Sequence, residues 1–309
     1  MLVHSKAKKE KIATMKKCFN FILICFIITQ SGFSQQSPKL NDYPYFYSSN
    51  EYYSKYLLNP SYTGYSKQHE FQFSTFDQLV GLANGVNSKT LSYNGFFDRI
   101  NSGIGLSVSA ESYGDFDKRH EISGLYSYQI LKSSNLSLAL GTKLGLSGRK
   151  IVDEMVEIDG KSLIGSGNWL NSPIMDLGLA LNYSRFNIGI TYKNLIENKI
   201  KFQNYETVLY SNGFIIDLTY EFKPTDKLII KPYFIDYYYK QNSFSMGLMG
   251  DINNKFFTGF GYDTYYKKIN ATIAISFLKY FQIGYLYENE NKYAFNELIL
   301  KIKIKPSSQ

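Results

Sequence analysis

Apolar and polar residues alternate along most of the chain, starting near residue 70. In residues 136–146 the even positions carry leucine at five of six places, whereas the odd positions carry serine, alanine, glycine or lysine. Residues 269–277 and 298–304 repeat this alternation. A period of two indicates β-strands with one apolar face. The pattern predicts about fourteen strands, which begin near residues 70, 90, 103, 120, 136, 174, 186, 214, 228, 243, 256, 269, 281 and 296.

The connections between these strands alternate in length. Those after even-numbered strands are tight, as at Ser184 and Arg185, and those after odd-numbered strands include all the long ones, such as 147–173 and 193–213. Outer-membrane barrels have short periplasmic turns and longer outer loops, and a closed ring satisfies every backbone hydrogen bond. We therefore predict an all-β fold, a transmembrane antiparallel β-barrel of about fourteen strands over residues 69–305. The alternative is a soluble β domain whose tyrosines fill a large core.

The first residues have the layout of a secretory signal peptide. Lys16 and Lys17 precede an apolar run over residues 19–28, and small residues follow it. The run is shorter than the ~20 residues that a spanning helix needs. We therefore predict a cleaved signal over residues 1–34, with Met15 as the natural start, and export to the outer membrane of a Gram-negative cell.

Removal of this segment changes the charge and the cysteine count. The formal net charge is +8, and it falls to +3 without the six Lys and one Glu of residues 1–34. A nucleic-acid partner would call for a strongly basic mature domain, so none is expected. Cys18 and Cys25 also lie in this segment. The mature chain therefore has no thiol for a disulfide, a metal site or a nucleophile.

Residues 35–68 form a polar, tyrosine-rich arm before the first strand. Within it, Asn59 to Gly64 (NPSYTG) reads as an ordered turn, because Pro60 fixes its own φ and glycine tolerates unusual backbone conformations. The arm is too short to fold alone and must lean on the domain that follows. It either plugs the barrel, with Tyr62 as an anchor against the wall, or lies in the periplasm and holds a partner.

No catalytic, cofactor or metal-binding pattern stands out. The mature chain has only His69 and His120, and neither has the spacing of a zinc site. Asp115 and Asp117 lie near Glu111 in a predicted outer loop, where the choice is between calcium binding and a solvated loop. We expect no enzymatic activity and no cofactor.

Two further features bear on the barrel. Glycines recur with period two at Gly103 and Gly105 and at Gly259 and Gly261, which indicates crowded interior faces. Aromatic residues near strand ends are typical of interfacial girdles. The candidates are Tyr126, Tyr128, Tyr183, Tyr192, Tyr237, Tyr238, Tyr239, Tyr262, Tyr265, Tyr285 and Tyr287.

Several motifs in order resemble the PorP/SprF family of the Bacteroidota type IX secretion system. They are the segments 57–64 (LLNPSYTG), 76–82 (FDQLVGL), 103–107 (GIGLS) and 284–288 (GYLYE). Family members typically show asparagine-proline-alanine-tyrosine-alanine-glycine and then glutamine-tryptophan-valine-glycine. This chain departs at Ser61, Thr63 and Leu79. The candidate family positions carried over are Asn59, Pro60, Tyr62, Gly64 and Gln78.

The resemblance implies a non-enzymatic outer-membrane barrel that supports secretion or surface attachment of proteins with type IX C-terminal domains, including gliding adhesins. Its partners would be other components of that machinery and a secreted protein. The alternative function is a channel or transporter for small molecules, like fatty-acid-type barrels or porins.

Overall fold

Strand makes up most of the computed structural model, which describes thirteen parts of the chain. These are residues 53–78, 86–114, 117–151, 155–158, 161–164, 167–196, 199–202, 205–208, 212–238, 242–264, 267–277, 280–290 and 293–304. The predicted signal of residues 1–34 and the arm as far as residue 52 lie outside these parts, and their boundaries stay predictions.

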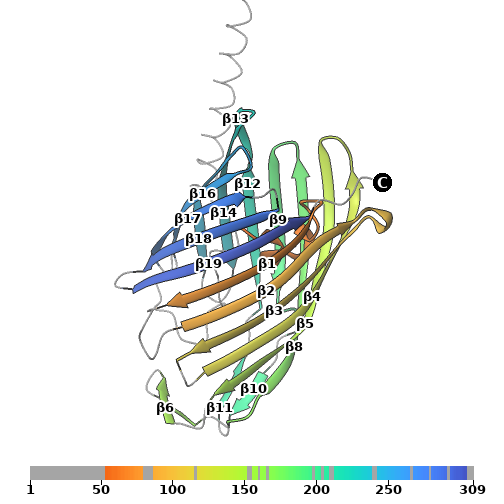
Figure 1. The fold of residues 1–309 in the computed structure, drawn as a ribbon. Coiled ribbons are helices and arrows are strands. Elements are labelled where there is room, and N and C mark those ends of the chain that lie inside the picture. The colour runs from red at the N-terminus through yellow and green to blue at the C-terminus, as the bar shows by residue number, and fades with distance from the viewer. Residues whose placement is uncertain are drawn as a thin grey trace, which may run out of the picture.

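Antiparallel strands close into one ring (Figure 1). Its fourteen members follow in chain order, and β12 and β14 are adjacent in the ring. They are β1 (His69–Gln78), β2 (Val86–Phe97), β3 (Ser102–Tyr113), β4 (Asp117–Lys132), β5 (Leu136–Ile151), β8 (Leu170–Tyr183), β9 (Phe186–Lys193), β12 (Gly213–Tyr220), β14 (Leu228–Tyr238), β15 (Asn242–Ile252), β16 (Phe256–Asp263), β17 (Lys268–Phe277), β18 (Phe281–Glu290) and β19 (Tyr293–Ile304). The ring closes where β1 pairs with β19 along its whole length. The predicted barrel is confirmed, and no predicted strand start is more than four residues from the observed one.

The alternation of short and long connections is also confirmed. Short turns gather at the end of the barrel where β1 begins and β19 ends (Figure 1). The opposite end carries the long connections, which hold two small hairpins outside the ring, β6 (Met155–Ile158) with β7 (Lys161–Ile164) and β10 (Lys199–Phe202) with β11 (Tyr205–Val208). We call the two ends the short-turn end and the long-loop end.

A short accessory strand, β13 (Phe222–Thr225), follows β12 at the short-turn end. It pairs with β14 at Phe222 and Thr225 with a shift of register between them. Pro232 of β14 lies between this pairing and the β12 pairing, and proline has no N–H to donate to a ladder. The wall therefore changes register beside Glu221.

The outer face of the ring is apolar and exposed, and the inner face is polar and buried. Leu91 and Phe260 are both 58% exposed, whereas Gln72, Asp217 and Glu288 are each 1% exposed. This is the reverse of a soluble protein and is what a barrel with a lipid-facing surface requires. Within the described residues, no helix is long and apolar enough to cross a membrane.

Most of the predicted girdle tyrosines lie on the outer face. Those with more than a third of their surface exposed are Tyr126, Tyr128, Tyr183, Tyr238, Tyr262, Tyr285 and Tyr287. Tyr192 is half-buried and packs against Phe214. The prediction was wrong for Tyr237, which is 2% exposed and packs inside against Leu58. Tyr239 and Tyr265 lie outside the described residues.

Candidate functional site: the plug and its seat

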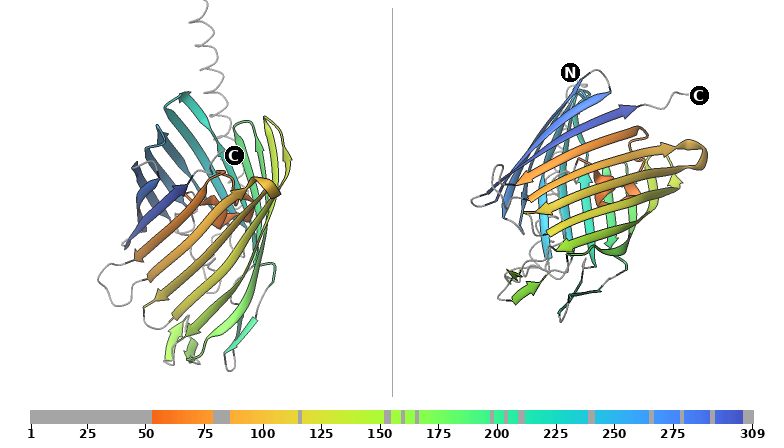
Figure 2. Two further views of the ribbon diagram at one scale, coloured as in Figure 1. Left: turned by 45° about the vertical axis from the view of Figure 1, so that its right-hand side comes forward. Right: turned by 60° about the horizontal axis from the view of Figure 1, so that its bottom comes forward.

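Residues 53–66, which we call the plug, lie inside the ring near its short-turn end (Figure 2). The plug contains one helical turn, α2 (Lys55–Leu58), and a 3-10 turn, η3 (Pro60–Tyr62). The 3-10 turn packs against β4, β5 and β8. The arm was expected either to plug the barrel or to lie in the periplasm; residues 53–66 of it lie inside the barrel.

The motif Asn59 to Gly64 builds its own turn. Pro60 is the first residue of η3, and Asn59 before it is extended, as a residue that precedes proline should be. The Asn59 Oδ1 accepts hydrogen bonds from the Ser61 N–H at 3.0 Å and from the Ser61 hydroxyl at 2.6 Å. Gly64 has a φ of +74°, which favours glycine. The predicted ordered turn is confirmed.

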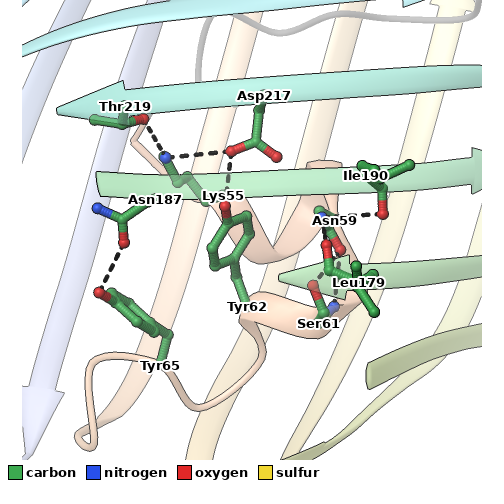
Figure 3. Close-up of polar contacts among 10 residues, drawn as sticks. All are labelled: Lys55, Asn59, Ser61, Tyr62, Tyr65, Leu179, Asn187, Ile190, Asp217 and Thr219. Atoms are coloured by element: carbon green, nitrogen blue, oxygen red, sulfur yellow. Dashed lines mark hydrogen bonds and ion pairs between the residues drawn. The ribbon is translucent and has the colours of Figure 1, made fainter. Parts of the chain in front are cut away.

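Asn59 also attaches this turn to the wall (Figure 3). Its side chain is fully buried, and its Nδ2 donates to the carbonyl oxygens of Leu179 in β8 at 3.2 Å and Ile190 in β9 at 3.5 Å. An amide supplies both an acceptor for the turn and donors for the wall. Neither aspartate nor leucine would satisfy both sides.

Asp217 of β12 is the charged partner of the plug (Figure 3). Its Oδ1 accepts a hydrogen bond from the Tyr62 hydroxyl at 2.8 Å and lies 3.4 Å from the Lys55 Nζ. The Lys55 ammonium also donates to the Thr219 hydroxyl at 2.5 Å. Asp217 is therefore the point at which the predicted anchor Tyr62 meets the barrel.

Burial sets the protonation of both plug side chains. Burial, and then the negative charge of Asp217, hold the pKa of Tyr62 well above its ordinary value, so its hydroxyl stays a donor. Burial lowers the pKa of Lys55, and Asp217 acts in the opposite direction. Asp217 thus favours the charged form of Lys55 against the effect of burial.

Four interior glycines, Gly103, Gly141, Gly178 and Gly189, form the seat that receives the plug. A Cβ on Gly141 would lie 2.3 Å from the Ser61 nitrogen, and one on Gly103 would lie 1.9 Å from the Thr63 carbonyl oxygen. The corresponding distance from Gly178 to the Asn59 Oδ1 is 2.2 Å. Such contacts are closer than any side chain allows, so the backbone of the plug lies directly on the wall. The predicted crowding at Gly103 has this cause.

Further contacts hold the plug on the opposite side of the lumen. Ser54 donates to the Gln72 Oε1 at 2.5 Å, and the hydroxyls of Tyr56 and Ser92 share a hydrogen bond of 2.9 Å. Lys301 of β19 donates to the Tyr53 carbonyl at 3.2 Å, and its ammonium lies 4.1 Å from the centre of the Tyr53 ring. The plug therefore spans the lumen rather than resting on one wall.

Gln78 lies apart from this site. It is the last residue of β1, opposite Phe295 at the long-loop end. Leu79 lies outside the described residues, as does Asp115. The structure brings together four of the five candidate family positions and leaves Gln78 at the other end of the barrel.

The polar residues considered for metal binding have other partners. His69 shares a hydrogen bond of 2.7 Å with the Tyr93 hydroxyl, and the ring of His120 packs against Trp169. Asp117 is not in a solvated loop: it is 4% exposed and lies 2.8 Å from both Arg119 and Arg149. Across the described parts of the chain, no three His, Cys, Asp or Glu side chains gather as a metal site would need.

Sequence reasoning missed Lys55, Asp217 and three of the seat glycines, Gly141, Gly178 and Gly189; it predicted crowding at Gly103 but not its cause. Asp217 could have been found from the sequence, because it is an acidic residue at an inward position of an apolar strand (GFIIDLTY). A buried carboxylate needs a partner. Its partner Lys55 lies 162 residues away, and no local pattern links the two.

Replacement of Tyr62 by phenylalanine tests the anchor with little change of shape. Loss of the hydroxyl leaves an acceptor on Asp217 with one donor fewer, at a cost of about 1–2 kcal/mol. We expect trypsin to cleave after Lys55 about tenfold faster in the reconstituted barrel, since cleavage requires the plug to leave its seat. Tyr65→Phe, which removes an exposed hydrogen bond to Asn187, is the matched control. Equal rates for Tyr62→Phe and the wild type would mean that Tyr62 is not an anchor.

The fold is shared with known outer-membrane proteins. The toluene transporter TodX of Pseudomonas putida is 11% identical, with a TM-score of 0.50 over 88% of this chain and 100% of its own. The outer membrane protein Omp33 of Acinetobacter baumannii is 11% identical, with a TM-score of 0.48 over 77% of this chain and 98% of its own. These likenesses concern the fold alone. No curated protein sequence matches the chain.

A family model gives the relationship that the solved structures do not. The model described as "Type IX secretion system membrane protein PorP/SprF" matches residues 34–298. The match includes the plug, the seat and the barrel as far as Leu298, halfway along β19. The chain therefore belongs to the PorP/SprF family of type IX secretion system membrane proteins.

Proposed function

We propose that the protein is a closed outer-membrane barrel that supports secretion or surface attachment of proteins with type IX C-terminal domains, gliding-type adhesins among them. It acts by binding and holding its partners, which are components of the secretion machinery and one exported protein. No step of this role needs catalysis, and the family is described as one of type IX secretion system membrane proteins.

The observation that carries the proposal is the occupied interior. The plug lies in the lumen near the short-turn end and is bound to strands on both sides of the ring. Inward side chains nearer the long-loop end are buried too: Asp176, Glu288 and Glu297 are each at most 2% exposed. A lumen of this kind favours a scaffold over an open pore.

A pull-down from native membranes tests the secretion role. With an affinity tag after residue 309 of the full-length protein, we expect secretion components and one large exported protein to be recovered. A barrel of similar size from the same membrane, tagged in the same way, is the control. Recovery of neither class of partner would contradict the type IX role.

Conductance in planar bilayers distinguishes the proposal from the channel alternative. We expect the purified full-length barrel to show no large stable pore, because the plug remains seated. Resistance of the Lys55 site to trypsin in the same sample would verify that the plug is in place. Large persistent pores under the same conditions would favour transport of small molecules. The structural likeness to TodX concerns the fold and does not decide between the two.

A further inference from the structure

Basic residues are spread around the whole short-turn rim. Each of the five short turns described in full contains or adjoins an exposed Lys or Arg. These are Arg99 between β2 and β3, Lys132 between β4 and β5, Arg185 between β8 and β9, Lys227 between β12 and β14, and Lys255 between β15 and β16. No single strand or turn accounts for the charge.

The rim is basic overall, although it carries acids. Counting also Lys67, Lys223, Lys231 and Lys303, the described rim has nine bases against five acids, which are Glu70, Asp98, Glu221, Asp226 and Asp251. Glu221 is already bonded to Lys223 at 2.7 Å and to Lys231 at 3.0 Å. Asp251 accepts a hydrogen bond from the Asn254 N–H at 2.8 Å. The acids thus leave a net positive rim.

Two of these bases lie against each other. Lys67, just after the plug, is adjacent to Lys132. The Lys132 side chain, and after it burial, hold the pKa of Lys67 below its ordinary value. Asp98 is near enough to oppose this effect. An anion between two ammonium groups would relieve their repulsion.

The outer surface immediately behind the rim is apolar and aromatic. Phe97, Tyr128, Tyr183 and Tyr280 are 37%, 47%, 60% and 45% exposed. Aromatic rings at this depth mark the boundary between hydrocarbon and headgroups. The basic side chains therefore stand at the level of the headgroups of the inner leaflet, with short turns on the periplasmic side.

We propose that this basic rim binds the phosphate headgroups of anionic phospholipids in the inner leaflet of the outer membrane. Charges that surround the barrel match a ligand that surrounds it, as lipid does. A protein partner docked on one sector would need charge on that sector alone. Lysine and arginine beside an anionic lipid surface each favour binding, and together they select anionic over neutral headgroups.

The test compares lipids that remain with the full-length barrel after extraction from bilayers of phosphatidylcholine and phosphatidylglycerol. We expect the wild type to retain phosphatidylglycerol roughly tenfold above its bulk share, since each charge near the surface contributes several-fold. A rim variant, Arg99→Gln, Lys132→Gln, Arg185→Gln and Lys255→Gln, should fall to the bulk ratio. Native mass spectrometry counts both lipids.

The matched control removes four charges at the opposite end, with Lys89→Gln, Lys118→Gln, Lys150→Gln and Lys267→Gln, and should retain phosphatidylglycerol like the wild type. Unchanged enrichment in the rim variant would overturn the proposal. Equal loss in both variants would also overturn it, because net charge and not the rim would then be responsible. Co-purification of an acidic protein without any lipid preference would assign the rim to a protein and refute lipid binding.

Discussion

Replacement of Asp217 by alanine should release the plug from the barrel. The change removes the acceptor of the Tyr62 hydroxyl and leaves the Lys55 ammonium with the Thr219 hydroxyl and the face of the Tyr62 ring. Loss of one partner of a buried pair and of a buried hydrogen bond together cost about 3 kcal/mol, with allowance for the partial exposure of Lys55. We expect trypsin cleavage after Lys55 to accelerate about a hundredfold in the reconstituted protein.

The control for Asp217→Ala is Asp226→Ala, which removes an exposed carboxylate from the neighbouring turn. It should leave the cleavage rate within about twofold of the wild type, as surface changes usually do. Both variants should migrate on gels as folded barrels. If Asp217→Ala remained folded and resisted trypsin as well as the wild type, the plug would be held by its backbone contacts alone.

A single methyl group at Gly141 should have a similar effect by a different route. In Gly141→Ala the new Cβ would lie within 2.5 Å of the backbone of Pro60 and Ser61. Backbone atoms cannot move aside as a flexible side chain does, so the plug must rise from its seat, at about 3 kcal/mol. We expect cleavage after Lys55 to accelerate about a hundredfold and conductance to appear in planar bilayers.

Gly259→Ala is the matched control, because Gly259 is also an inward glycine of the barrel. Its added Cβ would have no neighbour nearer than 3.7 Å, which is ordinary contact. This variant should stay uncleaved and closed. Equal opening in the two glycine variants would indicate a general loosening of the barrel, and a closed Gly141→Ala would show that the seat has room to spare.

The barrel was predictable from sequence because its period and its loops carry independent signals. The leucines of residues 136–146 gave one face of β5, and the order of tight and long connections separated a membrane barrel from a soluble sandwich. The inward placement of Tyr237 was not predictable. It lies in a run of three tyrosines, where a shift of one residue exchanges the two faces of the strand.

The site was only half predictable for a similar reason. Pro60 and Gly64 indicate a turn through their own backbone preferences, which can be read from the sequence directly. The seat is built from Gly103, Gly141, Gly178 and Gly189, which lie on β3, β5, β8 and β9 and come together only when these strands pair side by side. Their spacing also fits a plain need for small residues, so the sequence does not reveal that they receive a segment from the same chain.

The pairing of β1 with β19 bears on the order of assembly. The seam joins the first and last strands, so the ring cannot close until the whole chain has been delivered. The plug precedes β1 and contacts strands from β1 to β12, which are all complete by Tyr220. Its contacts with Tyr237 of β14 and Lys301 of β19 can form only later. Those strands can wrap around the plug before β14 to β19 arrive. We therefore expect the barrel to be inserted into the membrane already filled, with no stage at which an open pore crosses it.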